Sequence, residues 1–187
     1  MRGWQAVLVN IGTALLLIPP IVVTERLILT EEVEKVRKSV DKQLAELRKI
    51  STQHDVTREA LPPSGERTRR FRQTFEEVKE QVKDTDINAE KARDLFKLPY
   101  GDRLIVLASA QVKQNPKLFP QVIEAIEHSI TAFEQARALD AADVMLPKLS
   151  EAQKQQLVKV INENPWISEG STHRWKVSRR ILKKLGH

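Results

Sequence analysis

The histidines and the carboxylates near them are the first residues to consider for chemistry. The chain contains four histidines: His54, His128, His173 and His187. In a helix, Glu124 would share a face with His128, and Glu127 is adjacent in sequence. One imidazole with one carboxylate is an incomplete metal site, and no H-E-x-x-H motif is present. We therefore expect a surface or partly buried histidine here, and we predict no metal and no cofactor.

Other catalytic signatures are missing from the sequence. The chain has no cysteine, which excludes disulfides, thiolate metal sites and a cysteine nucleophile. It also has no glycine-rich phosphate loop and no G-x-S-x-G motif. Asp140 and Asp143 share one helical face, as many solvated carboxylates do. The sequence therefore predicts a protein that is not an enzyme.

Positive charge is concentrated at the C-terminal end. The formal net charge is +6, and residues 171–187 alone carry six lysines and arginines with no acidic residue. Ser171 or Thr172 can cap a final helix whose apolar positions are Trp175, Val177, Ile181, Leu182 and Leu185. A basic amphipathic helix with a tryptophan at its edge is typical of contact with an anionic membrane surface. The candidate contacts with anionic lipid or an acidic partner are Arg174, Trp175, Lys176, Arg179, Arg180, Lys183 and Lys184.

Two other interpretations of the basic C-terminal helix stay open. Its apolar side could instead dock on the rest of the protein, which would leave the basic side free. A contact with nucleic acid is not expected, because no motif that reads or stacks on bases accompanies the charge.

A second basic cluster consists of Arg67, Arg69, Arg70 and Arg72, just before Phe71 and around it. Guanidinium groups so close together on one helix could bind phosphates or an acidic partner. The alternative is a solvated helix face, since Glu76 and Glu77 follow at pairing distance from Arg72.

The elements that must position these side chains begin with an apolar segment. Residues 4–23 contain no charged residue, and a helix of that length rises about 30 Å, which matches the hydrocarbon core of a bilayer. A cleaved signal peptide would need a small-x-small site that is missing, and a buried core helix usually keeps a polar stripe. We therefore predict a transmembrane anchor within residues 1–29. Its characteristic residues are Trp4, Asn10, Gly12, Pro19 and Pro20.

Each of those anchor residues has a physical role. Trp4 suits the headgroup region, and Pro19 and Pro20 predict a kink or a break in the helix. Asn10 and Gly12 would allow the anchor to pair with another helix. More lysines and arginines follow the anchor than precede it, so the positive-inside rule predicts an N-terminus outside and a cytoplasmic body.

Residues 30–85 are predicted to form a hairpin or a stalk. Thr30 can cap a helix to about Gln53, and its apolar stripe has a coiled-coil spacing over fewer than three heptads. A Pro-Pro-Ser-Gly turn at 62–65 precedes a second helix. The stripes are Val33, Val36, Val40, Leu47 and Ile50 in the first helix, and Phe71, Phe75, Val78 and Val82 in the second. They could pack together as an antiparallel hairpin, or the first could pair with another copy of the protein.

Residues 86–167 are predicted to form a helical body. Asn88 and Asp102 are expected helix caps, Ser150 with Gln153 forms a capping box, and one stripe is expected to run from Val122 to Phe133. Segments 103–126 and 137–161 each predict a helix, a Pro-Lys-Leu turn and a second helix. They resemble the helix pairs of HEAT or tetratricopeptide repeats but lack the signature positions of either family. A chance likeness between amphipathic helices is the alternative.

The sequence thus predicts an all-α protein: one N-terminal transmembrane helix, a helical hairpin or stalk, a small helical body with two candidate helix-pair repeats, and a basic amphipathic helix over 168–187. The function that fits is a non-catalytic scaffold, adaptor or accessory subunit of a membrane-associated assembly. Its expected partners are the lipid bilayer and either other proteins or further copies of itself. The alternative is a self-associating membrane effector or sensor that acts through its anchor and stalk.

Overall fold

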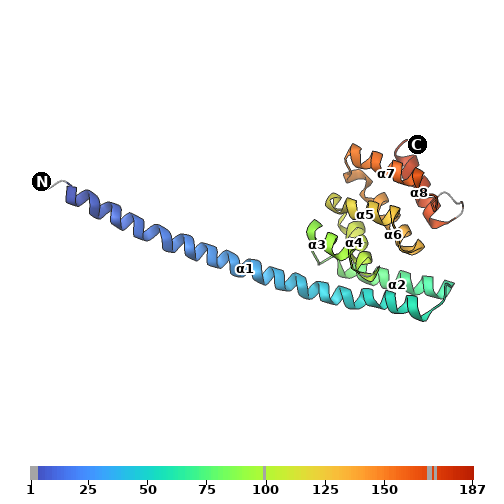
Figure 1. The fold of residues 1–187 in the computed structure, drawn as a ribbon, viewed down its shortest axis with the longest axis horizontal. Helices are drawn as coiled ribbons and strands as arrows, with labels where there is room; N and C mark the ends of the chain where they lie inside the picture. The colour runs from blue at the N-terminus through green and yellow to red at the C-terminus, as the bar shows by residue number, and fades with distance from the viewer. Residues whose placement is uncertain (1–3, 99, 168–169, 171) are drawn as a thin grey trace. The chain divides into compact units, whose positions relative to one another are not determined.

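The computed structural model describes residues 4–98, 100–167, 170 and 172–187, with side chains from residue 32 onward. The described residues form eight α-helices and two short 3-10 helices and contain no strand, so the all-α prediction is confirmed (Figure 1). The helices are α1 (Trp4–Ala60), α2 (Gly65–Gln81), α3 (Ala89–Phe96), α4 (Tyr100–Lys113), α5 (Phe119–Glu127), α6 (Ala132–Met145), α7 (Glu151–Glu163) and α8 (His173–Lys184).

The chain divides into two units, residues 1–42 and 43–187, and α1 contributes to both. In the first unit, Val33 and Val36 of the expected stripe are 65% and 64% exposed. The side chains of the candidate anchor, including Trp4, Asn10, Gly12, Pro19 and Pro20, lie outside the described residues. Among the residues that are described, no helix is long and apolar enough to cross a membrane. The anchor therefore stays a prediction.

The second unit begins with the last turns of α1, which pack against α2. The helix runs past Gln53 to Ala60, because no helix-breaking residue lies between Gln53 and the prolines at 62 and 63. Helix α1 also continues across positions 19 and 20, so the break predicted there is wrong. His54 of α1 stacks on Phe71 of α2 with 3.7 Å between the ring centroids. Leu44 and Leu47 belong to the same core as the apolar side of α2. The C-terminal part of α1 thus contacts α2, while the hairpin over the whole of residues 30–85 stays a prediction. Thr30 was expected to cap the first helix but lies inside α1.

Helix α4 lies at the centre of the unit and is buried along most of its length. Every residue from Arg103 to Ala110 is buried. Gly101 allows α4 to approach α1 closely, since a Cβ atom there would lie 2.5 Å from the Ser51 carbonyl oxygen. Asp102 was expected to cap this helix, but α4 begins two residues earlier and Asp102 instead pairs with Arg48 of α1 at 3.3 Å. A contact between distant segments has replaced the local one.

The two helix pairs predicted from sequence are present. A 3-10 turn at Pro116–Leu118 joins α4 to α5, and another at Leu146–Lys148 joins α6 to α7. Helix α6 packs against α4, α5 and α8, and α5 packs against α7. The stripe expected to run from Val122 to Phe133 is broken, because α5 ends at Glu127 and Phe133 belongs to α6. The predicted caps Asn88 and Ser150 are confirmed, the latter as a full capping box.

Helix α8 docks on α6 through its apolar side. Val177, Ile181 and Leu182 are buried in the common core, while Trp175 is only partly buried. The carboxylate of Asp143 on α6 accepts hydrogen bonds from Arg180 (2.9 Å) and Lys184 (2.7 Å). This is the docking alternative for the C-terminal helix. Its apolar side is therefore used within the protein.

Candidate anion-binding site

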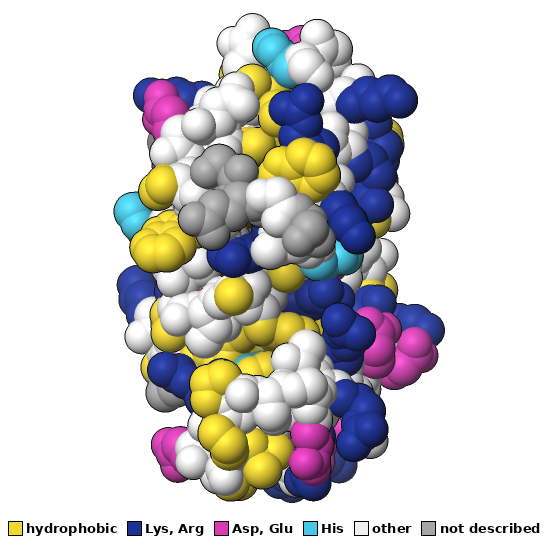
Figure 2. All heavy atoms as spheres, turned by 90° about the vertical axis from the view of Figure 1, so that its right-hand side faces the viewer, with side chains coloured by type: hydrophobic (Ala, Val, Ile, Leu, Met, Phe, Trp, Pro, Cys, Tyr) yellow, Lys and Arg dark blue, Asp and Glu magenta, His cyan; other side chains and the backbone are white. Residues whose placement is uncertain are grey.

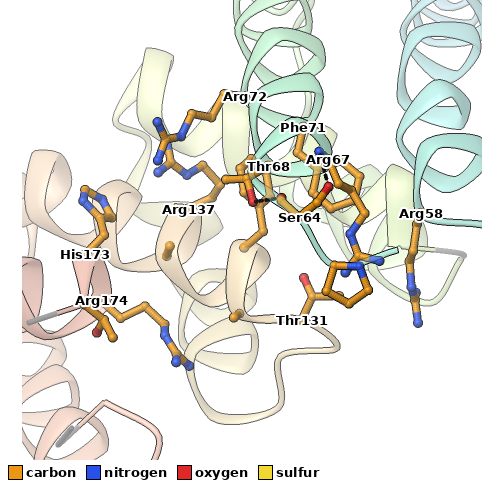
Figure 3. Close-up of a pocket in the computed structure, with 15 residues that line it drawn as sticks. Arg58, Ser64, Arg67, Thr68, Phe71, Arg72, Thr131, Arg137, His173 and Arg174 are labelled. Atoms are coloured by element: carbon orange, nitrogen blue, oxygen red, sulfur yellow. Dashed lines mark hydrogen bonds between the residues drawn. The ribbon is translucent and has the colours of Figure 1, made fainter. Parts of the chain in front are cut away.

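A cavity of about 560 Å³ lies within the second unit, where α2, α6 and α8 begin (Figure 3). It has apolar walls, hydroxyl groups and a cationic rim. The apolar walls are formed by Pro63, Phe71, Ala132, Phe133 and Ala136. The hydroxyls come from Ser64, Thr68, Thr131 and Thr172, and the cationic groups from Arg58, Arg67, Arg72, Arg137 and Arg174. His173 also lines the cavity. Among the described residues that line it, none is an aspartate or a glutamate.

Three helix starts meet at this cavity. Ser64 is the N-cap of α2, Thr131 the N-cap of α6 and Thr172 the N-cap of α8. Each side-chain oxygen accepts the hydrogen bond of one backbone N–H in the first turn of its helix, at 3.1 to 3.2 Å. A helix N-terminus carries about half a positive charge and presents further N–H groups. The three helices thus direct positive potential at one volume.

Arg67 is held in place at the start of α2. Its guanidinium donates a hydrogen bond to the Leu61 carbonyl at 3.1 Å and lies 5.6 Å from the centre of the Phe71 ring. The carbonyl belongs to the turn that the two prolines produce, so the turn itself orients this arginine. It makes no ion pair with a described residue.

Arg137 reaches the cavity from the second turn of α6. It pairs with Asp140 at 3.1 Å and stacks over the Phe133 ring at 5.2 Å. Its Nε–H is buried and finds no acceptor among the described residues. This donor lies against the rings of Phe75 and Phe133, so the ion pair with Asp140 and these rings hold the guanidinium in place.

Helix α8 supplies two further groups. Arg174 donates a hydrogen bond to the Gln135 side-chain oxygen at 2.7 Å, which joins the start of α8 to α6. His173 lies 2.9 Å from the Asp140 carboxylate. A histidine next to a carboxylate occurs in nucleophilic active sites, but none of the cavity's described hydroxyls forms a hydrogen bond with His173. In the described structure the His173 ring therefore pairs with Asp140 alone.

Arg58 and Arg72 are the most exposed cations of the rim. Neither makes an ion pair with a described residue. Burial raises the pKa of Asp55, one turn before Arg58, and the positive charge of Arg58 opposes that rise. In Figure 3, Arg58 and Arg67 lie on one side of the cavity, and Arg72, Arg137 and Arg174 lie on the other. A ligand in the cavity would therefore be surrounded by guanidinium groups.

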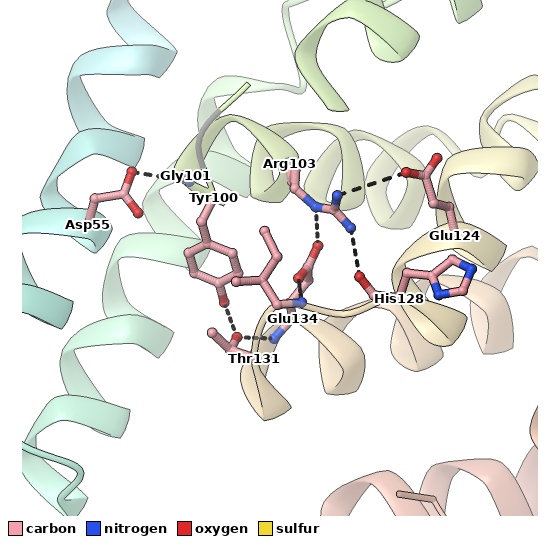
Figure 4. A network of polar contacts seen from close by, with 9 residues as sticks. Asp55, Tyr100, Gly101, Arg103, Glu124, His128, Thr131 and Glu134 are labelled. Atoms are coloured by element: carbon pink, nitrogen blue, oxygen red, sulfur yellow. Dashed lines mark hydrogen bonds and ion pairs between the residues drawn. The ribbon is translucent and has the colours of Figure 1, made fainter. Parts of the chain in front are cut away.

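A buried polar network joins α4 to the start of α6, next to the cavity (Figure 4). Arg103 of α4 pairs with Glu134 of α6, whose side chain is 0% exposed. The second oxygen of Glu134 accepts the Ile130 N–H at 2.7 Å, and Thr131 donates a hydrogen bond to the Tyr100 hydroxyl, also at 2.7 Å. Burial raises the pKa of both Glu134 and Tyr100. This network fixes the first turn of α6, and hence one wall of the cavity.

His54 lies beneath the apolar wall in an aromatic box. Its ring stacks on Phe71 and meets Tyr100 edge-on at 4.6 Å and Phe133 at 5.6 Å. Both ring nitrogens are buried without a hydrogen-bond partner in the described chain. Desolvation, with smaller contributions from Arg58 and Arg67, lowers the pKa of His54 to about 3. The ring is therefore neutral at physiological pH and acts as part of the core.

The structure brings together parts of the two basic clusters found in the sequence. Arg67 and Arg72 of the second cluster line the cavity, whereas Arg70 pairs with Glu66 at 2.8 Å and Arg69 is exposed outside it. Arg174 is the member of the C-terminal cluster that lines the cavity. The other cations of that cluster either bind Asp143, as Arg180 and Lys184 do, or are exposed, as Lys176, Arg179 and Lys183 are.

Two of the arginines that line the cavity could not be identified from the sequence. Arg58 and Arg137 are isolated in sequence, so no local cluster marks them. The caps Ser64 and Thr131 could have been found as helix starts, but not as neighbours. His128, which was considered as a metal ligand, is exposed, and Glu124 pairs with Arg103 instead. In the described part of the chain, no three His, Asp or Glu side chains are placed to hold a metal ion.

The face that contains these helix starts is seen in Figure 2, where lysine and arginine side chains gather along one edge beside hydrophobic ones. In comparisons with known proteins, no family model, no curated protein and no solved structure matches the chain.

Proposed function

We propose that this protein is a membrane-anchored adaptor or accessory subunit whose helical body binds an acidic segment of a partner protein. The observation that carries the proposal is the cavity at the starts of α2, α6 and α8. It is lined by five arginines and a histidine and, among its described lining residues, by no carboxylate. Paired charge is usual on a protein surface, and a cavity with one sign of charge attracts the opposite sign.

The apolar walls favour a partner segment over a simple ion. The cavity volume of about 560 Å³ is in the range of sites that enclose an organic ligand, and such sites combine apolar walls with a few polar groups. An acidic peptide can place carboxylates on the arginines while its side-chain carbon atoms contact Phe71 and Phe133. Binding without chemistry fits the pairing of His173 with Asp140 alone in the described structure.

The predicted anchor would keep this cavity near a membrane surface, with the body in the cytoplasm. In this proposal the docked α8 acts as a wall of the cavity rather than as a lipid-inserting helix. Its exposed cations, Lys176, Arg179 and Lys183, could still contribute electrostatic attraction to anionic lipid. The protein would thus hold an acidic partner close to the bilayer.

The test compares full-length protein with a cavity variant and a matched control. Arg58→Glu with Arg72→Glu reverses two rim charges that have no ion-pair partner among the described residues. Lys117→Glu with Lys159→Glu makes the same change in net charge at exposed positions outside the cavity. Each protein is purified in mild detergent with its bound proteins. We expect at least one acidic partner to be lost from the cavity variant alone.

Two outcomes contradict the proposal. If the cavity variant and the control retain the same partners, the cavity does not bind them. If extraction of membranes at alkaline pH releases the full-length protein, the anchor is wrong. The alternative of a self-associating effector predicts a homo-oligomer that forms without a partner, which light scattering in detergent detects.

A further inference from the structure

The positive charge around the cavity would be balanced only by a ligand with more than one negative charge. Asp140 partly neutralises Arg137, with which it pairs at 3.1 Å. Arg58, Arg67, Arg72 and Arg174 have no carboxylate within ion-pair distance in the described chain. One carboxylate brings a single charge, whereas a phosphate monoester carries about −1.5 to −2 and three acceptor oxygens at neutral pH.

Donor groups reach the cavity from more than one direction. Guanidinium groups come from both sides of the cavity, and the N-cap residues of three helices line it as well. Helix starts and arginines together are a usual way for proteins to bind phosphate.

The group that carries the phosphate must be apolar and broad. Phe71 and Phe133 line the cavity beside the arginines, together with Ala132 and Ala136. Phosphoserine has one methylene group behind its phosphate, and an inositol headgroup is covered with hydroxyls, so neither would use these walls. An aromatic ring would lie beneath the guanidiniums, against the partly exposed Phe133 and the small exposed part of Phe71.

We propose that the cavity binds an aryl phosphate, presented as a phosphotyrosine side chain of the partner protein. The inference rests on the proposed function and specifies its ligand. The phosphate contacts the arginines and the helix starts, and the tyrosine ring lies against Phe71 and Phe133. Binding of the partner would then depend on its phosphorylation.

The first experiment measures binding of a fluorescent alanine–glycine peptide with one tyrosine, phosphorylated or not, to the full-length protein in neutral detergent. We expect the phosphorylated peptide to bind at least about tenfold more tightly, since new charge-assisted hydrogen bonds are each worth more than the 1.4 kcal/mol of a tenfold change. Arg58→Gln with Arg72→Gln should reduce binding about tenfold. Lys117→Gln with Lys159→Gln should not change it, and thermal melting of each variant checks its folding.

Further ligands separate the sources of the phosphate. Phenyl phosphate should compete with the peptide, and a phosphoserine peptide should bind more weakly than the phosphotyrosine peptide. If the tyrosine peptide binds equally tightly with and without its phosphate, the inference is wrong. So does cavity-dependent binding to vesicles that contain a phosphoinositide when the phosphotyrosine peptide does not bind, because the ligand is then a lipid headgroup.

Phosphatase treatment distinguishes this inference from the proposed function. If a partner binds in a cavity-dependent way and phosphatase treatment of the lysate abolishes its capture, both are supported. If its capture survives phosphatase, the adaptor function stands and the phosphotyrosine inference is wrong. If no partner depends on the cavity, the proposed function fails, whatever the peptides do.

Discussion

Lowering the pH should destabilise this protein through His54. The ring is 0% exposed, is surrounded by Phe71, Tyr100 and Phe133, and has no hydrogen-bond partner in the described chain. Its pKa in the folded protein is lowered from 6.5 to about 3. Between those two values the unfolded chain binds a proton that the folded chain does not. Folding stability is therefore intact above the unfolded pKa and is lost as the pH falls below it.

The size of this effect follows from the pKa difference. Each pH unit below the unfolded pKa costs about 1.4 kcal/mol of unfolding free energy until the folded pKa is reached. Between about pH 7.5 and about pH 5, the loss from this single group is on the order of 2 kcal/mol. That is a large part of the stability of an ordinary domain.

The assay is urea denaturation of the full-length protein in detergent at both pH values, for the native chain and two variants. His54→Leu removes the titrating ring and keeps an apolar side chain of similar volume. Phe71→Leu removes the stacked partner but keeps the ring. We expect His54→Leu to lose about 2 kcal/mol less than the native chain on acidification, while Phe71→Leu keeps most of the native pH dependence despite lower stability at both values.

Comparing variants cancels the contributions of the buried carboxyl groups, which are the same in each protein. If His54→Leu shows the native pH dependence, the His54 ring is not the group that titrates. The conclusion that this ring is buried without a hydrogen-bond partner would then be wrong.

Two further predictions concern packing behind the cavity. Glu134→Gln should lower the free energy of unfolding by about 3 to 5 kcal/mol, because buried Arg103 then keeps only the half-exposed Glu124, at 3.9 Å. Glu66→Gln at an exposed pair should cost less than about 1 kcal/mol. Similar losses in urea denaturation would contradict this. Gly101→Ala should cost about 1 to 3 kcal/mol, since its Cβ would meet backbone of α1 at 2.5 Å, while Gly65→Ala, with nothing within 4 Å, should have the native melting temperature or a higher one. Equal melting temperatures for the two glycine variants would show that α1 and α4 are not in such close contact.

Local features of this fold could be predicted from sequence because their causes are local. Asn88, Ser150 and Thr172 cap helices in the structure as their positions predict, since a cap needs only its own side chain and the next few backbone N–H groups. The Pro-Lys-Leu turns that join the helix pairs were found for the same reason. Asp102 was misassigned because Arg48, 54 residues away, offers a stronger partner than the helix start does.

One part of the candidate site could be predicted from sequence, and the other part depends on tertiary structure. The sequence by itself determined that the chain is helical, that arginines cluster at 67–72 and that the basic C-terminal helix has an apolar side. It could not show that this side faces α6, or that Ser64, Thr131 and Thr172 cap helices whose starts meet at one cavity. Those residues are 41 to 108 positions apart in the chain, and only the packing of α2, α6 and α8 in a common core brings them together. The tertiary structure therefore decided which cations act together, because a binding site depends on distances in space that spacing along a helix does not fix.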